Sequence, residues 1–268
     1  MCEKKGLPLR VVVEALQSYA NTSLAASWDN VGLLIEPTEK KAISHILLTN
    51  DLTEDVMQEA IDVKADMIIS YHPPIFSPLK SITTKTWKER IAARCLENRI
   101  SLYSPHTSFD SIKGGVNDWL AAAFDIKEIR PIEPGENPEN GMGRVFTLQD
   151  KISLEEAVDL VKKHTGLKHV RLSRSKGSNK PIKKVGLCAG SGGSLLKDLW
   201  VDLYVTGEML HHDVLDAAHR GISVILTNHS DSERGFLRTV FAQKLTDLLN
   251  GVVTVSVSEK DEDPLKTV

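Results

Sequence analysis

The chain has 268 residues, of which 41% are hydrophobic and 26% charged, a balance that is typical of a globular protein and excludes a disordered one. Its formal net charge is −3 and its pI about 6.3. Direct binding of nucleic acid needs a basic excess and is therefore not expected. A small anionic substrate is compatible with this charge, because a bound metal supplies local positive charge.

The cysteines and the apolar runs bear on the compartment. Cys2, Cys95 and Cys188 are far apart and odd in number, which argues against a disulfide framework and against a cysteine zinc site. No apolar run approaches the roughly 18 residues that a membrane span needs, and the first residues lack the apolar segment of a signal peptide. We therefore expect a cytoplasmic protein with no membrane partner, and the sequence leaves entry into the nucleus open.

Apolar runs of strand length alternate with helical patterns in the first half of the chain. We predict helices at 9–20, 53–64 and 86–98, and strands at 43–49, 67–71 and 100–104. Short β-branched runs between helices of this length are typical of βαβ units, whose strands form a parallel sheet.

A segment rich in proline and glycine, 131–143, breaks both periodicities and is expected to separate two lobes, 1–130 and 131–268. Further strands are predicted at 145–148, 169–172, 185–189, 203–205, 222–227 and 252–257, and a surface loop at 173–180. Helices are expected from Ser153, which fits a capping box with Glu156, and at 211–220 and 235–249. The sequence thus predicts an α/β fold of two related lobes with mostly parallel sheets.

Polar and reactive side chains follow most of the predicted strands. In open α/β sheets the ligand crevice lies outside the carboxyl ends of the strands, so these side chains are the candidates for a site between the lobes. In chain order they are Asn50, Asp51, His72, His106, Asp110, Gly190, Ser191, Gly192, Gly193, Glu208, His211, His212, His229 and Glu233.

His72, Asp110, His229 and Glu233 are the candidate metal ligands. Imidazole and carboxylate groups suit zinc, iron or manganese, and a carboxylate such as Glu233 can bridge two ions, so one or two divalent ions are expected. Each residue also has a structural interpretation. Glu233 would face a helix macrodipole, His229 would lie on a surface loop, His72 would be a buried hydrogen-bonded residue, and Asp110 would cap a turn.

The other candidates would handle protons and substrate. Glu208, His211 and His212 are candidate catalytic residues that would shuttle protons; two adjacent helical residues point about 100° apart, so the two histidines do not easily face one ion. Tyr71 and His106 are candidate substrate-binding residues. The turn of Gly190, Ser191, Gly192 and Gly193 could cradle an anion with its backbone N–H groups, although a tight structural turn is the default interpretation.

Six short motifs occur in the order in which one protein family has them. They are SWDNVGL at 27–33, YHPPIF at 71–76, HTSFD at 106–110, GSGG at 190–193, TGE at 206–208 followed by His211 and His212, and HSDSE at 229–233. With these motifs the chain resembles the NGG-interacting factor three-like family, also described as GTP cyclohydrolase I type 2-like. The resemblance extends over nearly the whole chain, from residue 9 to residue 257.

The resemblance implies a ring-shaped homohexamer of two-lobed α/β subunits with a dinuclear metal site. His72, Asp110 and Glu233 would bind one ion, and His229 and Glu233 the second. Many members have two adjacent histidines before the proline, whereas this chain has Tyr71 at the first position, so the second ion would lose a ligand or take a phenol oxygen. The short segment 131–143 has no room for the separate domain that some members insert.

Two functions remain as hypotheses. The first is a metal-dependent hydrolase of a nucleotide-like or phosphorylated small molecule, with GTP as the substrate that the family description implies. The second is a non-enzymatic role as a metal-bearing scaffold or as a protein that interacts with transcription regulators, and the missing histidine at Tyr71 favours it.

Overall fold

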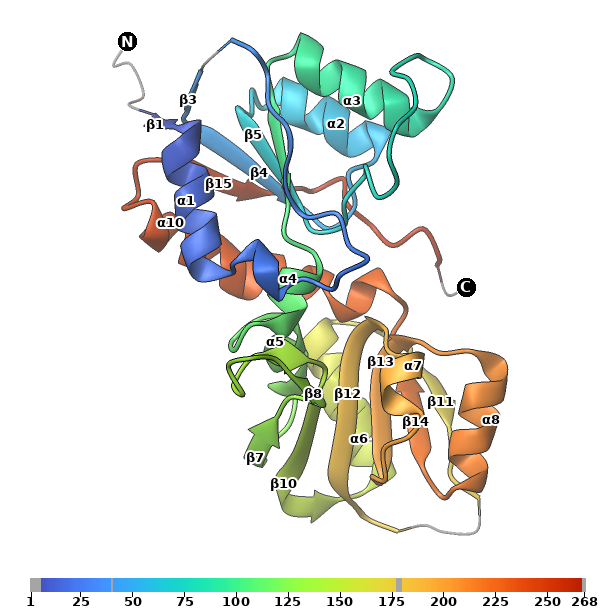
Figure 1. Ribbon diagram of the computed structural model, residues 1–268. Helices are drawn as coiled ribbons and strands as arrows, with labels where there is room; N and C mark the ends of the chain where they lie inside the picture. Colours follow the sequence, from blue (N-terminus) through green and yellow to red (C-terminus); the bar gives the residue numbers. More distant parts are fainter. Residues whose placement is uncertain (1–5, 40, 177–179, 267–268) are drawn as a thin grey trace. The chain divides into compact units, whose positions relative to one another are not determined.

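The computed structural model describes residues 6–39, 41–176 and 180–266, and Figure 1 shows the course of the chain through them. These residues form two compact units. Unit 1 runs up to Phe109 and takes in Leu237–Glu262, whereas unit 2 consists of Asp110–Phe236 and the residues from Asp263 on. Within the described ranges, no helix has both the length and the apolar character needed to cross a membrane.

Unit 1 is built on a five-stranded sheet in the order β15-β4-β5-β6-β2. The first four of these strands run parallel, and β2 pairs antiparallel with β6. A separate antiparallel pair joins β1 to β3. The strands are β1 (Leu7–Pro8), β2 (Gly32–Ile35), β3 (Ala42–Ile43), β4 (His45–Thr49), β5 (Met67–Ser70), β6 (Ser101–Ser104) and β15 (Thr254–Val257).

Helices cover both faces of the unit 1 sheet. Helices α2 (Glu54–Asp62) and α3 (Trp87–Glu97) lie side by side on one face, and α1 (Leu9–Tyr19) and α10 (Ala242–Leu248) lie on the other (Figure 1). Alternate strand residues point to opposite faces, so Leu47, Ile68 and Leu102 form one buried cluster with α2 and α3. Each such side chain contributes about 1.5–3 kcal/mol when fully buried. The short helices are η1 (Thr22–Leu24), the π-helix η3 (Leu237–Phe241) and α4 (Thr107–Ser111), within which the units divide.

Unit 2 is built on a six-stranded sheet in the order β11-β14-β13-β12-β10-β7. The central strands β12, β13 and β14 are parallel, whereas β11, β10 and β7 pair antiparallel with their neighbours. A small hairpin pairs β8 with β9. The strands are β7 (Ile126–Arg130), β8 (Glu133–Pro134), β9 (Gly141–Met142), β10 (Arg144–Ile152), β11 (Arg171–Ser173), β12 (Ile182–Ser191), β13 (Leu203–Glu208) and β14 (Ser223–Leu226).

The helices of unit 2 also pack on both faces of their sheet. Figure 1 shows α7 and α8 on one face and α6 on the other. Cys188, Tyr204 and Val224 belong to one buried cluster with residues of α7 and α8. The helices are α5 (Val116–Ala121), α6 (Leu154–Thr165), α7 (Gly193–Leu196), α8 (His211–His219), η2 (Ser230–Ser232) and α9 (Arg234–Phe236).

The predicted α/β class with mostly parallel sheets is confirmed, but the chain divides at a different place from the expected one. The units part at Phe109 and Asp110, and not at 131–143, so they differ from the expected lobes 1–130 and 131–268. The segment 131–143 lies inside unit 2, where it contains the β8–β9 hairpin. Buried Arg144 donates to the carbonyl oxygens of Gly141 and Gly143, both at 2.7 Å, and this holds the segment on the core.

Three expected elements differ in detail from the observed ones or are only partly described. The helix expected at 235–249 is divided into α9, which belongs to unit 2, and the π-helix η3 and α10, which belong to unit 1. In the expected surface loop 173–180, residues 177–179 lie outside the described residues. The strand expected at 169–172 is observed as β11, shifted to Arg171–Ser173.

Candidate metal centre

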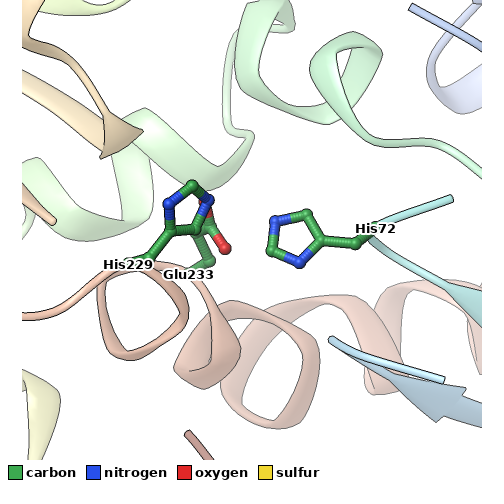
Figure 2. A group of neighbouring side chains, drawn as sticks. All are labelled: His72, His229 and Glu233. Carbon is green, nitrogen blue, oxygen red and sulfur yellow. The ribbon is translucent and has the colours of Figure 1, made fainter. Parts of the chain in front are cut away.

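His229 and Glu233 lie at the carboxyl end of β14, on either side of the short helix η2, as Figure 2 shows. The Nε2 atom of His229 is 3.5 Å from Oε1 of Glu233. Glu233 is only 4% exposed, so its carboxylate is largely withdrawn from water. Removing a carboxylate from water is costly unless a cation or donors compensate, and the nearby imidazole nitrogen is the kind of atom that shares a metal ion with it.

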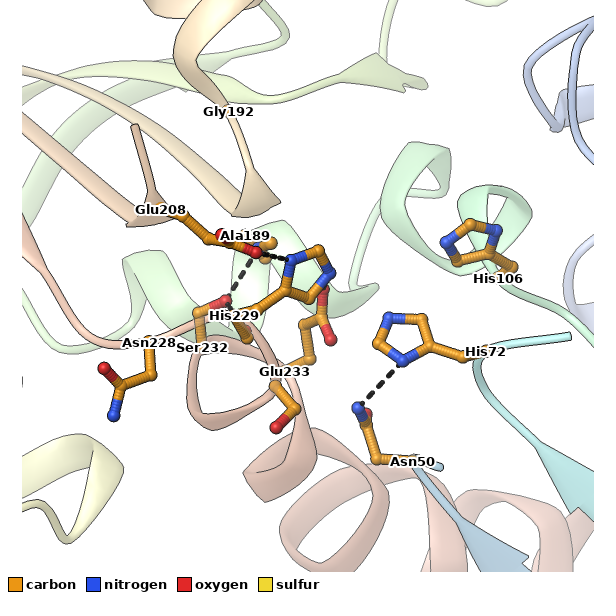
Figure 3. Close-up of polar contacts among 12 residues, drawn as sticks. Asn50, His72, His106, Ala189, Gly192, Glu208, Asn228, His229, Ser232 and Glu233 are labelled. Atoms are coloured by element: carbon orange, nitrogen blue, oxygen red, sulfur yellow. Dashed lines mark hydrogen bonds and ion pairs between the residues drawn. The ribbon is translucent and has the colours of Figure 1, made fainter. Parts of the chain in front are cut away.

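Glu208 at the end of β13 fixes the orientation of the His229 ring. Its carboxylate accepts a hydrogen bond from Nδ1 of His229 (Figure 3). This contact leaves Nε2, the nitrogen that faces Glu233, to carry the lone pair of the neutral ring. Metal-binding histidines commonly have such a carboxylate on the other ring nitrogen. Glu208, which we predicted as a proton shuttle, therefore orients a candidate ligand.

The glycine turn at 190–193 packs against His229 and Glu233 through Gly190. Gly190 has a φ of +63°, and a Cβ on it would lie 2.5 Å from Oε1 of Glu233 and 3.2 Å from Nε2 of His229. The N–H of Gly190 donates to Oγ of Ser232 at 2.7 Å. The N–H of Gly192 donates to Oγ1 of Thr206 at 3.0 Å. Two donors of the turn are thus engaged within unit 2, which favours the structural interpretation of this turn over the anion cradle.

Asp110 lies in α4, and its charge, like that of Glu233, acts on Cys188 of β12. It is 8% exposed, and its backbone oxygen accepts a hydrogen bond from the Asn117 side chain at 3.0 Å. Burial raises the pKa of the Cys188 thiol, and the negative charges of Asp110 and Glu233 raise it further. Both carboxylates therefore act on one buried thiol of β12, and unit 2 holds three of the four predicted ligands, Asp110, His229 and Glu233.

His72, the fourth predicted ligand, belongs to unit 1 and follows β5. Its Nδ1 lies 2.9 Å from Oδ1 of Asp51 and 3.4 Å from Nδ2 of Asn50, the contact drawn in Figure 3. Asp51 thus orients His72 as Glu208 orients His229. The loop that carries Asp51 is held by Asp261, whose carboxylate accepts from the backbone N–H groups of Asn50 at 2.7 Å and Asp51 at 3.3 Å.

Tyr71 and His106 lie next to His72 in unit 1. Tyr71 is 1% exposed, and its ring centroid is 5.1 Å from that of His72 and 5.6 Å from that of His106. His106 has a φ of +35°, which is uncommon for a residue with a side chain, and its Nδ1 is 2.8 Å from Oδ1 of Asp29. Asp29 was not among the predicted site residues, and its place in a family motif was its one signal in the sequence.

His211 and His212 open α8, and both are exposed. Their ring centroids are 5.3 Å apart. Among the described residues, neither histidine has a hydrogen bond to Glu208, His229 or Glu233. Their proton-transfer role therefore stays a prediction.

These features define a mixed α/β protein with histidines and carboxylates at its strand ends, and comparison with known proteins identifies the family. Residues 8–264 match the model of the Duf34/NIF3 (NGG1p interacting factor 3) family, and the chain belongs to this family. It is 52% identical to NIF3-like protein 1 of Drosophila melanogaster, over 98% of this chain and 90% of that protein. It is 38% identical to NGG1-interacting factor 3 of Saccharomyces cerevisiae, over 93% of this chain and 91% of that protein.

Solved structures agree with the fold. A Bacillus cereus protein related to NIF3 matches with a TM-score of 0.87 and 22% identity, over 98% of this chain and all of that one. Reduced HcgD from Methanocaldococcus jannaschii matches with a TM-score of 0.81 and 25% identity, over 95% of this chain and all of that one.

Proposed function

We propose that this protein binds one or two divalent metal ions through His72, Asp110, His229 and Glu233, and that it is a metal-dependent hydrolase. Its substrate class would be a nucleotide-like or phosphorylated small molecule. The observation that carries the proposal is the repeated carboxylate–histidine pair. Asp51 holds Nδ1 of His72 in unit 1, and Glu208 holds Nδ1 of His229 in unit 2.

The donor set fits a divalent transition metal. His72, His229 and Glu233 each offer one ligand atom of a type that such ions accept. In the arrangement that the family resemblance implies, His72, Asp110 and Glu233 would hold one ion, and His229 and Glu233 would hold a second. Imidazole and carboxylate ligands suit zinc, iron and manganese alike, so the metal is one of these three.

The chain's own side chains divide the remaining work. A divalent ion held there supplies Lewis acidity and activates water near neutral pH. Glu208 keeps the His229 ring in place, and His211 and His212, which are exposed at the start of α8, would exchange protons with solvent. Tyr71 and His106 would contact the substrate, whereas the turn of Gly190 to Gly193, with two of its donors engaged within unit 2, would shape the site beside Glu233.

A second candidate function is a metal-bearing scaffold that binds other proteins. Tyr71 stands where many family members have a histidine, and its packing against His72 and His106 suits a structural role. The yeast relative is named for an interaction with NGG1, which supports protein partners and work in the nucleus as well as in the cytoplasm. In both roles we propose a homo-oligomer, with the hexamer of the family as its form.

The experiment compares the wild type with the double variant Asp110→Ala, Glu233→Ala. Metal-loaded wild type should hydrolyse at least one member of a panel of nucleotides and phosphoesters, and the double variant should lose that turnover. If the wild type hydrolyses none of these compounds and its protein partners bind the double variant equally well, the scaffold function is favoured over the hydrolase.

A further inference from the structure

We propose that Trp28, Phe76 and His106 in unit 1 form a binding site for a flat aromatic heterocycle with a hydrogen-bonding edge, as in a nucleobase. The proposal extends the proposed function. The link between ring binding and hydrolysis rests on that proposed function. The binding step itself requires no metal.

Two aromatic side chains of this site are exposed and adjacent. Trp28 is 61% exposed and Phe76 is 44% exposed, and their ring centroids are 6.0 Å apart with an angle of 55° between the planes. The loops that carry them are tied together, because Nδ2 of Asn30 donates to the carbonyl oxygen of Ile75 at 2.5 Å. The open aromatic faces are therefore held on a fixed backbone.

His106 is the polar member of the site, and Asp29 holds it from behind. The Asp29 side chain is 0% exposed and accepts from Nδ1 of His106 at 2.8 Å and from Oγ1 of Thr107 at 2.5 Å. Burial raises the pKa of Asp29, but these hydrogen bonds outweigh it and hold the pKa below its ordinary value. Since Nδ1 is engaged by a carboxylate, Nε2 is the nitrogen that His106 presents to a ligand.

The ring geometry favours a flat ligand. The His106 ring stands at 72° to the Trp28 indole at a centroid distance of 6.0 Å, and at 79° to Phe76 at 6.5 Å. A ring that lies on the indole face therefore meets an imidazole set nearly perpendicular to it, which can hydrogen-bond to the ligand's edge. Base stacking on aromatic side chains tolerates any base because every base has a π-face. A sugar or an aliphatic chain has no such face.

The site adjoins the proposed metal ligand of the same unit. The ring centroids of His72 and His106 are 5.3 Å apart. His106 thus contacts both Trp28 and His72, so a group attached to a heterocycle on Trp28 could extend past His106 toward the proposed metal. This placement makes the aromatic site the ring-holding part of the substrate site.

The test measures binding of GMP and AMP to the full chain in EDTA, by saturation-transfer NMR on the ligand, with ribose 5-phosphate as the ligand that lacks the ring. We expect GMP or AMP to bind and ribose 5-phosphate not to bind. Trp28→Ala should weaken binding by about fivefold or more, as loss of one stacking surface implies. His106→Gln should weaken it as well.

Trp200→Ala is the matched control, because Trp200 is 76% exposed in unit 2, where it stacks with Arg220. The proposal is overturned if neither nucleotide binds, if ribose 5-phosphate binds equally well, or if Trp28→Ala and Trp200→Ala behave alike. It is also overturned if Trp28→Ala changes only the oligomeric mass, since a second copy would then cover the rings. Metal content measured on the same preparations tests the proposed function separately.

Discussion

Removal of the Glu208 carboxylate should weaken metal binding without unfolding the protein. Among the described residues, Glu208 contacts the candidate ligands only through Nδ1 of His229. Loss of such an orienting partner typically costs 10–100-fold in metal affinity, about 1.4–2.7 kcal/mol. The Glu208 and His229 side chains are 56% and 38% exposed, so water can replace the lost carboxylate, and we expect an effect near tenfold for Glu208→Ala.

The equivalent change in unit 1 should be more severe. The His72 and Asp51 side chains are only 21% and 35% exposed, so water replaces the lost carboxylate less well. Asp51→Ala should therefore lower the metal affinity by about 100-fold. The assay is competition of metal-free protein with a chromophoric chelator for Zn²⁺ and Mn²⁺, with circular dichroism as the check on folding. Glu155→Ala is the control, since the Glu155 side chain is 65% exposed and forms a surface ion pair with Arg174, far along the chain from the candidate ligands. The reasoning fails if both variants bind metal as tightly as this control.

Three further predictions concern the supports of the two units. Gly190→Ala should lower metal affinity and stability by more than Gly166→Ala, measured by chelator competition and thermal unfolding, because both glycines have positive φ but only Gly190 would place a Cβ against Glu233; equal effects would contradict it. Arg144→Met should destabilise unit 2 by about 3–5 kcal/mol in urea unfolding, since it leaves the Asp118 carboxylate without its buried partner; a change under about 1 kcal/mol, as for a surface pair, would contradict it. The pKa of Asp66 is lowered, because hydrogen bonds from Lys41 and Ser44 outweigh burial, so its contribution to stability is complete above the ordinary pKa and disappears as the pH falls through the lowered value. Asp66→Asn should therefore lose less stability than the wild type on acidification below pH 4, and parallel pH curves would refute this.

The local elements could be predicted from sequence because their signals are local. Apolar runs such as Ile68-Ile69 became buried strands, and Thr53 and Thr86 cap the helices that follow them. The division into units could not be predicted in this way. Strand β15, near the end of the chain, pairs with β4 of the first half. A local sequence pattern does not indicate which distant strands pair, so it could not assign β15 to unit 1.

The candidate ligands follow from a sequence pattern, and their metal binding stays a prediction, whereas the residues that orient them could not be predicted. His72, His229 and Glu233 stand out because strand ends in α/β sheets gather functional residues. Asp51 was visible at a strand end but had no assigned role, and its partnership with His72 depends on the pairing of β4 with β5. Asp29 lies in a family motif, but its contact with His106 could not be predicted, since the two residues are 77 positions apart.

The most direct test of the central claim is the metal content of tag-free protein, measured by elemental analysis for the wild type and for Glu233→Gln. The account predicts at least one equivalent of zinc, iron or manganese in the wild type, because buried Glu233 faces Nε2 of His229. It predicts a clear loss of that metal in the folded variant. Equal metal content in the two proteins, or a wild type that takes up none of the three metals after loading, would contradict it.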